Sequence, residues 1–263
     1  MSNEREKIEK KKKTETEEFI SGHISCLLTT LTLLFIPNTT KDDAFSKGEY
    51  ANSYDFFSYE DLTDRNDYFE SPARPIIPGS SIRGAIRGAY EAATNGCHPC
   101  TDGRDLCPAC ALFGMVGSES DEVHFDDSIN KSRASRLMFK DAVPYELIEG
   151  SGWSSWYDSV RVLPILGAAK KPQNQRMQIR PVRDGKTFKF DISFDRITKN
   201  ELDTLLSVLT FGGQNNTHAH KLGHGKSVGY GSVRITNTTV AVAHLAEDFN
   251  LLMQTQFPVA MVD

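Results

Sequence analysis

The sequence predicts an α+β domain, because it mixes several strand-like segments with a few helical ones. Residues 186–196 (KTFKFDISFDR) alternate between apolar and polar side chains, which is the period of a strand. Residues 19–37 are rich in Leu, Ile and Thr and predict one long buried strand that ends at Pro37. Residues 198–211 instead repeat leucine at helical spacing. These three segments together predict the mixed fold class.

The composition is that of an ordinary soluble protein. The chain has 263 residues, of which 39% are hydrophobic and 25% charged. Its net charge of −5 argues mildly against nucleic-acid binding, but net charge does not describe local patches. Acidic residues concentrate in 42–70 and 118–127, and basic residues gather elsewhere. No apolar run is long enough for a membrane span and no targeting segment is evident, so we expect a cytoplasmic protein with no membrane partner.

We expect a charged arm followed by a single folded domain. Residues 1–18 are almost all charged with both signs mixed, which is typical of a disordered arm. The domain would then occupy residues 19–263. Within it, residues 38–74 carry many Asp, Asn, Ser and aromatic side chains without periodicity. A segment of that length inside a compact domain is either functional or partly disordered.

Residues 75–114 hold the most informative motifs, which begin with a tight turn. Pro78 fixes its own φ angle, and Gly79 permits a backbone that other residues resist. Ser80 or Ser81 could then cap a helix by accepting hydrogen bonds from its first free N–H groups. The turn therefore predicts a helix start near residue 80.

Arg83 and Arg87 follow four residues apart, so they share one face of this helix. Because a helix N-terminus favours anions, the serines and arginines are compatible with a grip on a phosphate backbone. The alternative is a capped surface helix with two solvated arginines. Spacing alone does not choose between these interpretations.

Four cysteines follow the helix in two C-x2-C pairs, separated by six residues. They are Cys97, Cys100, Cys107 and Cys110. This spacing suits tetrahedral coordination of structural zinc by four thiolates, which leaves no open position for catalysis. A disulfide interpretation would need an oxidising compartment. The fifth cysteine, Cys26, lies in an apolar run and is expected to be buried in the core.

The second half of the chain contains further regular elements. Strands are expected at 135–144 and 233–245, with a terminal helix and tail at the end of the chain. Thr198 and Glu201 have the spacing of a capping box at the start of the helix 198–211. The glycine pair at 212–213 would end that helix.

Two segments of the second half suit contact with a phosphate backbone. Residues 170–183 combine cations with amides and lack apolar periodicity. Residues 221–233 (KLGHGKSVGYGSV) hold four glycines that would let backbone N–H groups approach phosphates, although a tight turn between strands is the alternative. The nearby Trp153 and Trp156 could stack on bases or pack in the core.

Several short motifs, in order, resemble those of one family. The run PIIPGSSIRGAIRGAYEAATN (75–95) resembles the hallmark segment of the CRISPR-associated RAMP superfamily, the RNA-binding backbone subunits of type III effector complexes. CPACALFG (107–114), SRLMFKDAVP (135–144) and KLGHGKSVGYGSVRI (221–235) resemble further family motifs. The partners that this resemblance implies are guide RNA, target RNA, other RAMP subunits and the large subunit of the complex.

The resemblance also implies a fold and a set of RNA contacts. The fold would be a ferredoxin-like (RRM-like) βαββαβ core with helices on one face of its sheet. Its insertions would be an extended hairpin or thumb at 38–74 and a zinc-binding knuckle at 95–114. The candidate RNA-binding residues are Ser80, Ser81, Arg83, Arg87, Lys170, Lys171, Arg176, His224, Lys226 and Ser227.

In catalytic members of the family, an aspartate between the first strand and the IPGSS turn cuts target RNA. Asp55 matches that place best, followed by Asp43 and Asp42, and then by Asp64 and Asp67. Such a carboxylate would hold Mg²⁺, which stabilises the charge that develops on the phosphate. The first alternative is a non-catalytic structural or capping subunit, in which Asp55 is an ordinary loop residue. A more distant alternative is a zinc-ribbon adaptor unrelated to CRISPR.

Overall fold

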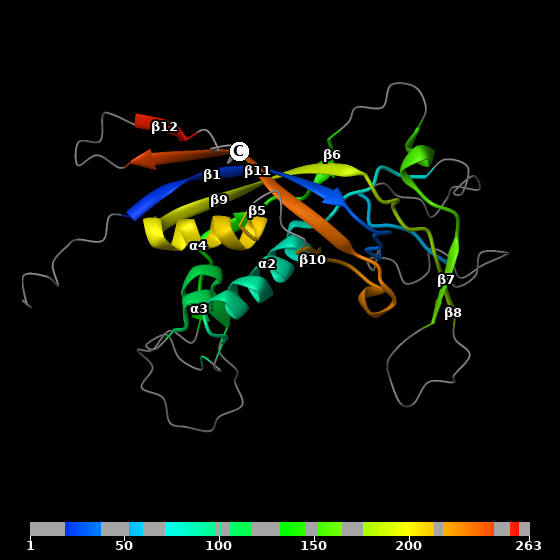
Figure 1. Cartoon of the computed structure of the whole chain (residues 1–263), viewed down its shortest axis with the longest axis horizontal. Helices are drawn as coiled ribbons and strands as arrows, with labels where there is room; N and C mark the ends of the chain where they lie inside the picture. The colour runs from blue at the N-terminus through cyan, green and yellow to red at the C-terminus, as the bar shows by residue number, and fades with distance from the viewer. Residues whose placement is uncertain are drawn as a thin grey trace, which may run out of the picture.

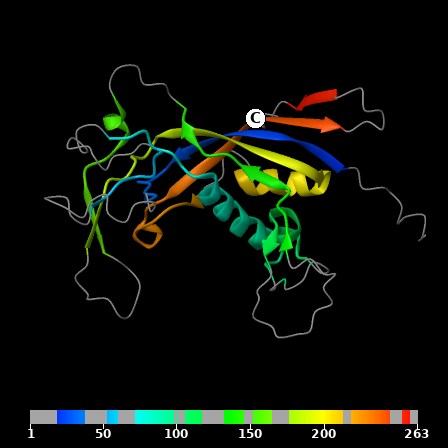
Figure 2. The same cartoon turned by 180° about the vertical axis from the view of Figure 1, so that it is seen from behind.

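The computed structural model describes residues 19–37, 53–59, 72–97, 100, 106–116, 132–145, 152–164, 176–212, 218–244 and 253–257. Its architecture is α+β, as the sequence predicts: a curled antiparallel sheet carries helices on one face (Figures 1 and 2). None of the helices in these ranges has the length and hydrophobicity that a membrane span requires. The predicted arm at 1–18 lies outside the described ranges, and the single-domain boundaries stay a prediction.

The main sheet has five strands in one path. Their order is β10 (His220–Lys221), β11 (Ser232–His244), β1 (Phe19–Thr30), β9 (Thr187–Thr198) and β5 (Leu137–Phe139). Two more strands extend it: β12 (Met253–Phe257) pairs with β11, and β6 (Val143–Pro144) pairs with β9. All of these pairings are antiparallel. The order β11-β1-β9-β5, with a helix after β1 and another after β9, is compatible with an RRM-like core.

The first strand is shorter than predicted, because the chain changes partner after Thr30. Beyond this residue the backbone leaves β9. Leu31 and Thr32 still donate to the carbonyl oxygen of Ser232, at 2.8 and 3.4 Å, and Leu34 then exchanges both hydrogen bonds with Val182, at 2.9 and 2.8 Å. Pro37 then forms a bridge with Phe56. The apolar residues Leu34, Phe35 and Ile36 are therefore buried in the core without extending the first strand.

The helices lie beneath the main sheet. They are α2 (Gly79–Ala93), α3 (Pro108–Phe113) and α4 (Lys199–Thr210). The predicted capping box of α4 is confirmed, since Thr198 and Glu201 each accept a hydrogen bond from the other's backbone N–H. The helix ends where the glycines predict: Phe211 is the cap residue, with φ of 51°, and Gly212 follows it in the left-handed region with φ of 82°, whereas Gly213 lies outside the described residues.

The core lies between the sheet and the helices. The alternation of β9 is confirmed, because its predicted apolar face is buried. The members of that face are Phe188, Phe190, Ile192 and Phe194. Cys26 of β1 is buried as expected, and burial raises the pKa of its thiol to about 12. Trp156, in the 3₁₀ turn η2 (Trp153–Trp156), packs its ring against the edge of Phe188 with 5.1 Å between centroids.

Smaller sheets flank the main one. β2 (Ser53–Tyr54), β8 (Arg176–Ile179) and β7 (Arg161–Pro164) form one sheet, and β3 (Met115–Val116) pairs with β4 (Ser132–Arg133). The strand expected at 135–144 is divided into β5 and β6, because Ala142 bonds to Ile77 between them.

The end of the chain corrects one prediction. The prediction of a terminal helix is wrong, since β12 is a strand that pairs with β11. The closing strand at 233–245 is confirmed as β11.

Gly22 tests the tight packing of the central strand. A Cβ at this position would lie 2.1 Å from the carbonyl oxygen of Ala241 and 2.7 Å from the ring of Phe194. We expect Gly22→Ala to lower the free energy of unfolding by about 1–3 kcal/mol, measured by urea denaturation. Gly88→Ala, at an exposed position of α2, is the matched control, because a Cβ there meets open space. This substitution should raise the free energy of unfolding by up to about 1 kcal/mol. Equal midpoints for Gly22→Ala and the native protein would contradict the packing.

Candidate functional site

The start of α2 is capped by a distant carboxylate and not by its serines. The cap residue is Pro78, and no side chain caps the helix from that position, so the predicted capping by Ser80 or Ser81 is wrong. Both serines lie inside the first turn, because the helix already begins at Gly79. The N–H of Gly79 donates to Oδ1 of Asp141 at 2.7 Å. Asp141 is separated from Gly79 by 62 positions, which is why local spacing does not reveal it.

Gly79 is required by the close approach of another strand. A Cβ on this residue would lie 2.2 Å from the carbonyl oxygen of Phe139 at the end of β5. Tyr59 donates its hydroxyl to the other oxygen of Asp141, and this hydrogen bond raises the pKa of Tyr59. The PGSS turn therefore docks the helix start on the β5–β6 connection.

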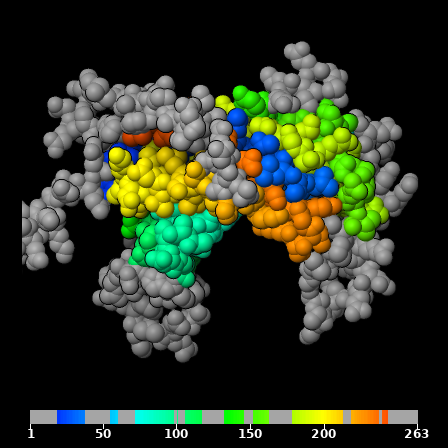
Figure 3. Space-filling model, viewed as in Figure 1, coloured from blue at the N-terminus to red at the C-terminus, as the bar shows by residue number. Residues whose placement is uncertain are grey.

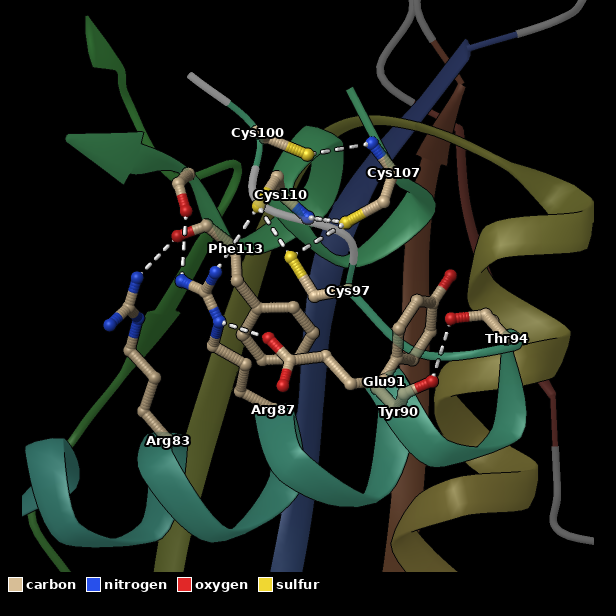
Figure 4. A network of polar contacts seen from close by, with 11 residues as sticks. Arg83, Arg87, Tyr90, Glu91, Thr94, Cys97, Cys100, Cys107, Cys110 and Phe113 are labelled. Carbon is tan, nitrogen blue, oxygen red and sulfur yellow. Dashed lines mark hydrogen bonds and ion pairs between the residues drawn. The ribbon is translucent and has the colours of Figure 1, made fainter. Parts of the chain in front are cut away.

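The two arginines of α2 point toward α3, as Figure 4 shows. Arg83 donates to the carbonyl oxygen of Phe113. Arg87 donates from Nη1 to the carbonyl oxygen of Gly114 at 2.9 Å and from Nε to Glu91 at 2.8 Å. A third contact joins its Nη2 to Sγ of Cys110 at 3.3 Å. The interpretation as two solvated arginines is therefore wrong, because both guanidinium groups are held by protein atoms.

A further arginine, Arg136, binds the same end of α3. Its Nε donates to the carbonyl oxygen of Ala111 at 3.1 Å, and its fork pairs with the carboxylate of Glu201 on α4. Cations are favoured at the C-terminus of a helix, where carbonyl groups lack partners within the helix. A helix of six residues is not stable alone, so these contacts fix α3 to α2 and α4. The sequence reasoning did not identify Arg136.

The four cysteines meet between α2 and α3 and are close enough to hold one metal ion. Their sulfur atoms all lie within 4.8 Å of one another. Cys97 lies 3.6 Å from Cys110 and 3.4 Å from Cys107, sulfur to sulfur. Tetrahedral coordination with metal–sulfur bonds of about 2.3 Å places sulfur atoms about 3.8 Å apart, so the cluster has a suitable size. None of the four forms a disulfide, which agrees with a ligand set.

Backbone N–H groups support the cysteine cluster. The N–H of Cys110 donates to the sulfur of Cys107, and the N–H of Cys107 donates to that of Cys100, each at 3.3 Å. Burial opposes ionisation of Cys107, but hydrogen bonds with the backbone N–H of Cys110 and with the thiols of the other three cysteines lower the pKa of its thiol. Cys107 is also the N-cap of α3. The helix start thus favours the thiolate form that a metal requires.

The glycine-rich segment forms a loop that is fixed at its base and exposed at its tip. Gly223 and Gly231 pack at the base, where added Cβ atoms would lie 2.1 Å from the Phe35 oxygen and 1.9 Å from the Leu222 oxygen. The tip is the 3₁₀ turn η3 (Lys226–Val228), bounded by two left-handed glycines. Its exposed side chains include His224, Lys226 and Ser227.

The glycine-rich loop and α2 flank a hollow on one face of the molecule. The space-filling view shows the hollow between the helix and the loop that contains η3 (Figure 3). Strand β10, which leads into the loop, contacts α2. The hallmark helix α2 thus lies beside a strand that follows it by more than 120 positions in the chain.

The remaining candidate residues are spread over other parts of the molecule. Arg176 begins β8, whereas Lys170 and Lys171 lie outside the described residues, as do Asp42, Asp43, Asp64 and Asp67. Asp55 is 2% exposed. Its charge acts on Arg180, whose pKa is lowered by burial and partly restored by this carboxylate. Arg180 is 9% exposed and lies over the ring of Tyr157, with 5.3 Å to its centroid.

Comparison with known proteins decides the family. The sequence model of the RAMP superfamily matches residues 27–234, most of the chain. The chain belongs to the RAMP superfamily. The interpretation as an unrelated zinc-ribbon adaptor is therefore wrong.

Among solved structures, this RAMP protein is similar to one chain of "Cryo-EM structure of the Type III-B Cmr-beta bound to cognate target RNA". The sequence identity is 18% and the TM-score is 0.45, over 93% of this chain and 68% of the other. A search of curated proteins found no match.

The contact between Gly79 and Asp141 can be tested in this RAMP protein by substitution. Asp141→Ala removes the acceptor for the first N–H of α2 and for the Tyr59 hydroxyl. We expect a loss of about 1–2 kcal/mol in the free energy of unfolding, measured in urea. Asp141→Asn keeps an oxygen acceptor, so its free energy of unfolding should fall less than that of Asp141→Ala. A variant Asp141→Ala as stable as the native protein would contradict this capping role.

Proposed function

We propose that this RAMP protein is a guide-RNA-binding backbone subunit of a type III CRISPR effector complex. The observation that carries the proposal is the hollow between α2 and the glycine-rich loop, which brings two family motifs together (Figure 3). Family membership supports other RAMP subunits, the large subunit and target RNA as further partners. The cytoplasm is the expected location.

The chemistry of the loop suits a phosphate backbone. Lys226 supplies a cation, and His224 and Ser227 supply hydrogen-bonding groups, all exposed at the tip. Left-handed glycines at 225 and 229 carry no side chain that would keep a phosphate away from the turn. Backbone contacts of this kind position RNA without reading its bases, so base pairing with the guide would supply the sequence specificity.

We propose structural zinc as the metal of the cysteine cluster. Four thiolates with this spacing select zinc over harder cations, and they leave no open coordination position. The ion would hold Cys97 and Cys100 against Cys107 and Cys110 and so stabilise α3. Its role is to complete the fold beside the RNA-binding helix.

Lys226 offers a direct test of RNA binding. We expect Lys226→Ala to weaken binding of a guide-length RNA several-fold and to reduce the slope of log K against log salt by about 1, because one phosphate contact is lost. Fluorescence anisotropy over a series of salt concentrations measures both effects. Lys199→Ala is the matched control, because Lys199 is an exposed lysine at the start of α4. Equal affinities and slopes for both variants would count against the loop as the RNA contact.

Cleavage of target RNA is the second candidate function, favoured by the aspartates of segment 38–74. Mg²⁺ held by one of these carboxylates would assist attack on the phosphate. The burial of Asp55 beside Arg180 favours a structural role for this residue in the described structure. Asp43 and Asp42 are then the preferred catalytic candidates.

The cleavage test uses the reconstituted complex with a guide-complementary RNA and Mg²⁺. If this subunit cuts, we expect Asp43→Ala or Asp42→Ala to abolish specific cuts while target binding is retained. Asp55→Asn should instead lower the thermal stability of the subunit, because a buried charge partner of Arg180 is removed. Asp203→Asn is the control for both effects, because Asp203 is an exposed residue of α4. Cleavage that none of these substitutions alters would leave the non-catalytic backbone subunit as the function.

A further inference from the structure

Arg87 belongs to both the helix of the hallmark motif and the surroundings of the metal centre. We propose that Arg87 is a positioning residue of that centre: it donates to the Cys110 thiolate and so links metal binding to the position of α2. The inference rests on the proposed metal centre. It gives Arg87 a role different from the phosphate grip that its spacing suggests.

The geometry uses all three nitrogen atoms of the guanidinium group (Figure 4). Nε donates to Glu91 at 2.8 Å, Nη1 to the Gly114 carbonyl at 2.9 Å, and Nη2 to Sγ of Cys110 at 3.3 Å. Each acceptor comes from a different part of the site: α2 itself, the residue that ends α3, and a metal ligand. The rigid planar fork of arginine can hold three such acceptors together, whereas a lysine cannot.

Glu91 orients the guanidinium group toward the cluster. It lies four residues after Arg87 on the same helix, and the side chains of Arg87 and Glu91 are 26% and 28% exposed. Partial burial reduces competition from water for these hydrogen bonds. The pair thus presents the Nη atoms of Arg87 to α3 and to Cys110.

Electrostatics explains why this contact should matter most when metal is bound. A divalent ion with four thiolates carries a formal charge of −2, which a nearby guanidinium offsets. A charged donor also bonds a thiolate more strongly than a neutral thiol. The contact therefore favours the deprotonated, metal-bound cluster, as outer-shell partners of metal ligands generally do.

Arg83, on the same helix, serves as an internal control for Arg87. It lies one turn earlier and donates to the carbonyl oxygen of Phe113, the residue before Gly114. Both arginines thus hold the end of α3, but the contact with a ligand sulfur is made by Arg87. Substitution of Arg83 removes a contact with the end of α3 alone, whereas substitution of Arg87 also removes the contact with the ligand sulfur.

The experiment titrates the full chain, purified metal-free under reducing conditions, with Co²⁺ and then competes Zn²⁺ against a chelator. The native protein should show the sulfur-to-cobalt absorption of a tetrathiolate site. Arg87→Gln should bind Zn²⁺ about 10- to 100-fold more weakly, whereas Arg83→Gln should stay within about three-fold of native. Circular dichroism confirms folding of each variant. If Arg87→Gln does not fold, Arg87→Lys is used in its place. We expect this variant to bind Zn²⁺ at least about five-fold more weakly than the native protein, because lysine cannot hold all three acceptors.

Two results would overturn the inference while the proposed metal centre stands. One is a native-like Zn²⁺ affinity in the folded Arg87 variant. The other is an equal loss in Arg83→Gln, which would assign the effect to α3 alone. Absence of the tetrathiolate spectrum in the native protein would instead overturn the metal centre, and the inference with it. RNA binding by the native protein is measured separately, so failure of the RNA proposal is distinguishable from both.

Discussion

The close approach of α2 to the end of β5 is the constraint on which the rest of the site depends. Gly79 has no Cβ, so its backbone can lie against the carbonyl group of Phe139, and its N–H can reach Asp141. This contact fixes where the helix begins and which face it turns to the sheet. Ile82, Ile86 and Tyr90 then point into the core. The arginines reach the end of α3, and β10, which leads into the glycine-rich loop, contacts the same helix.

The cysteine cluster is built on an element that cannot exist alone. α3 has only six residues, yet it contains one of the four clustered cysteines, Cys110, and a second, Cys107, is its N-cap. Its C-terminal carbonyl groups are bound by arginines from α2 and from the segment before β5. Metal coordination at one end and guanidinium contacts at the other would hold it in place. The order of the elements thus brings the cysteine cluster next to the hallmark helix of the family.

The surface proposed to bind RNA lies on a chain whose net charge is negative. The net charge is −5, but the loop between β10 and β11 exposes a lysine, a histidine and a serine on a turn framed by glycines. The base of that loop is packed against the residues that follow β1. A rigid base with an exposed tip suits repeated contact with a phosphate backbone. RAMP superfamily membership gives this surface its functional context.

The sequence by itself determined the features whose partners are near in the chain. Three such features depend on residues a few positions apart. They are the alternation of β9, the capping box of α4 and the two C-x2-C motifs. Local periodicity and short-range hydrogen bonds are enough to predict them. The family motifs likewise predicted the superfamily that the sequence match shows.

Only the tertiary structure decided the features whose partners are distant. Asp141 replaces the serines as the cap of α2, and α3 holds the arginines expected to face phosphate or solvent. Beyond Thr30 the chain leaves the sheet because Leu34 pairs with Val182. Residues 253–257 become a strand because the edge of β11 lies beside them. In each case a hydrogen-bond partner from another part of the chain outweighs the local preference. Such partners become neighbours only when the sheet has formed.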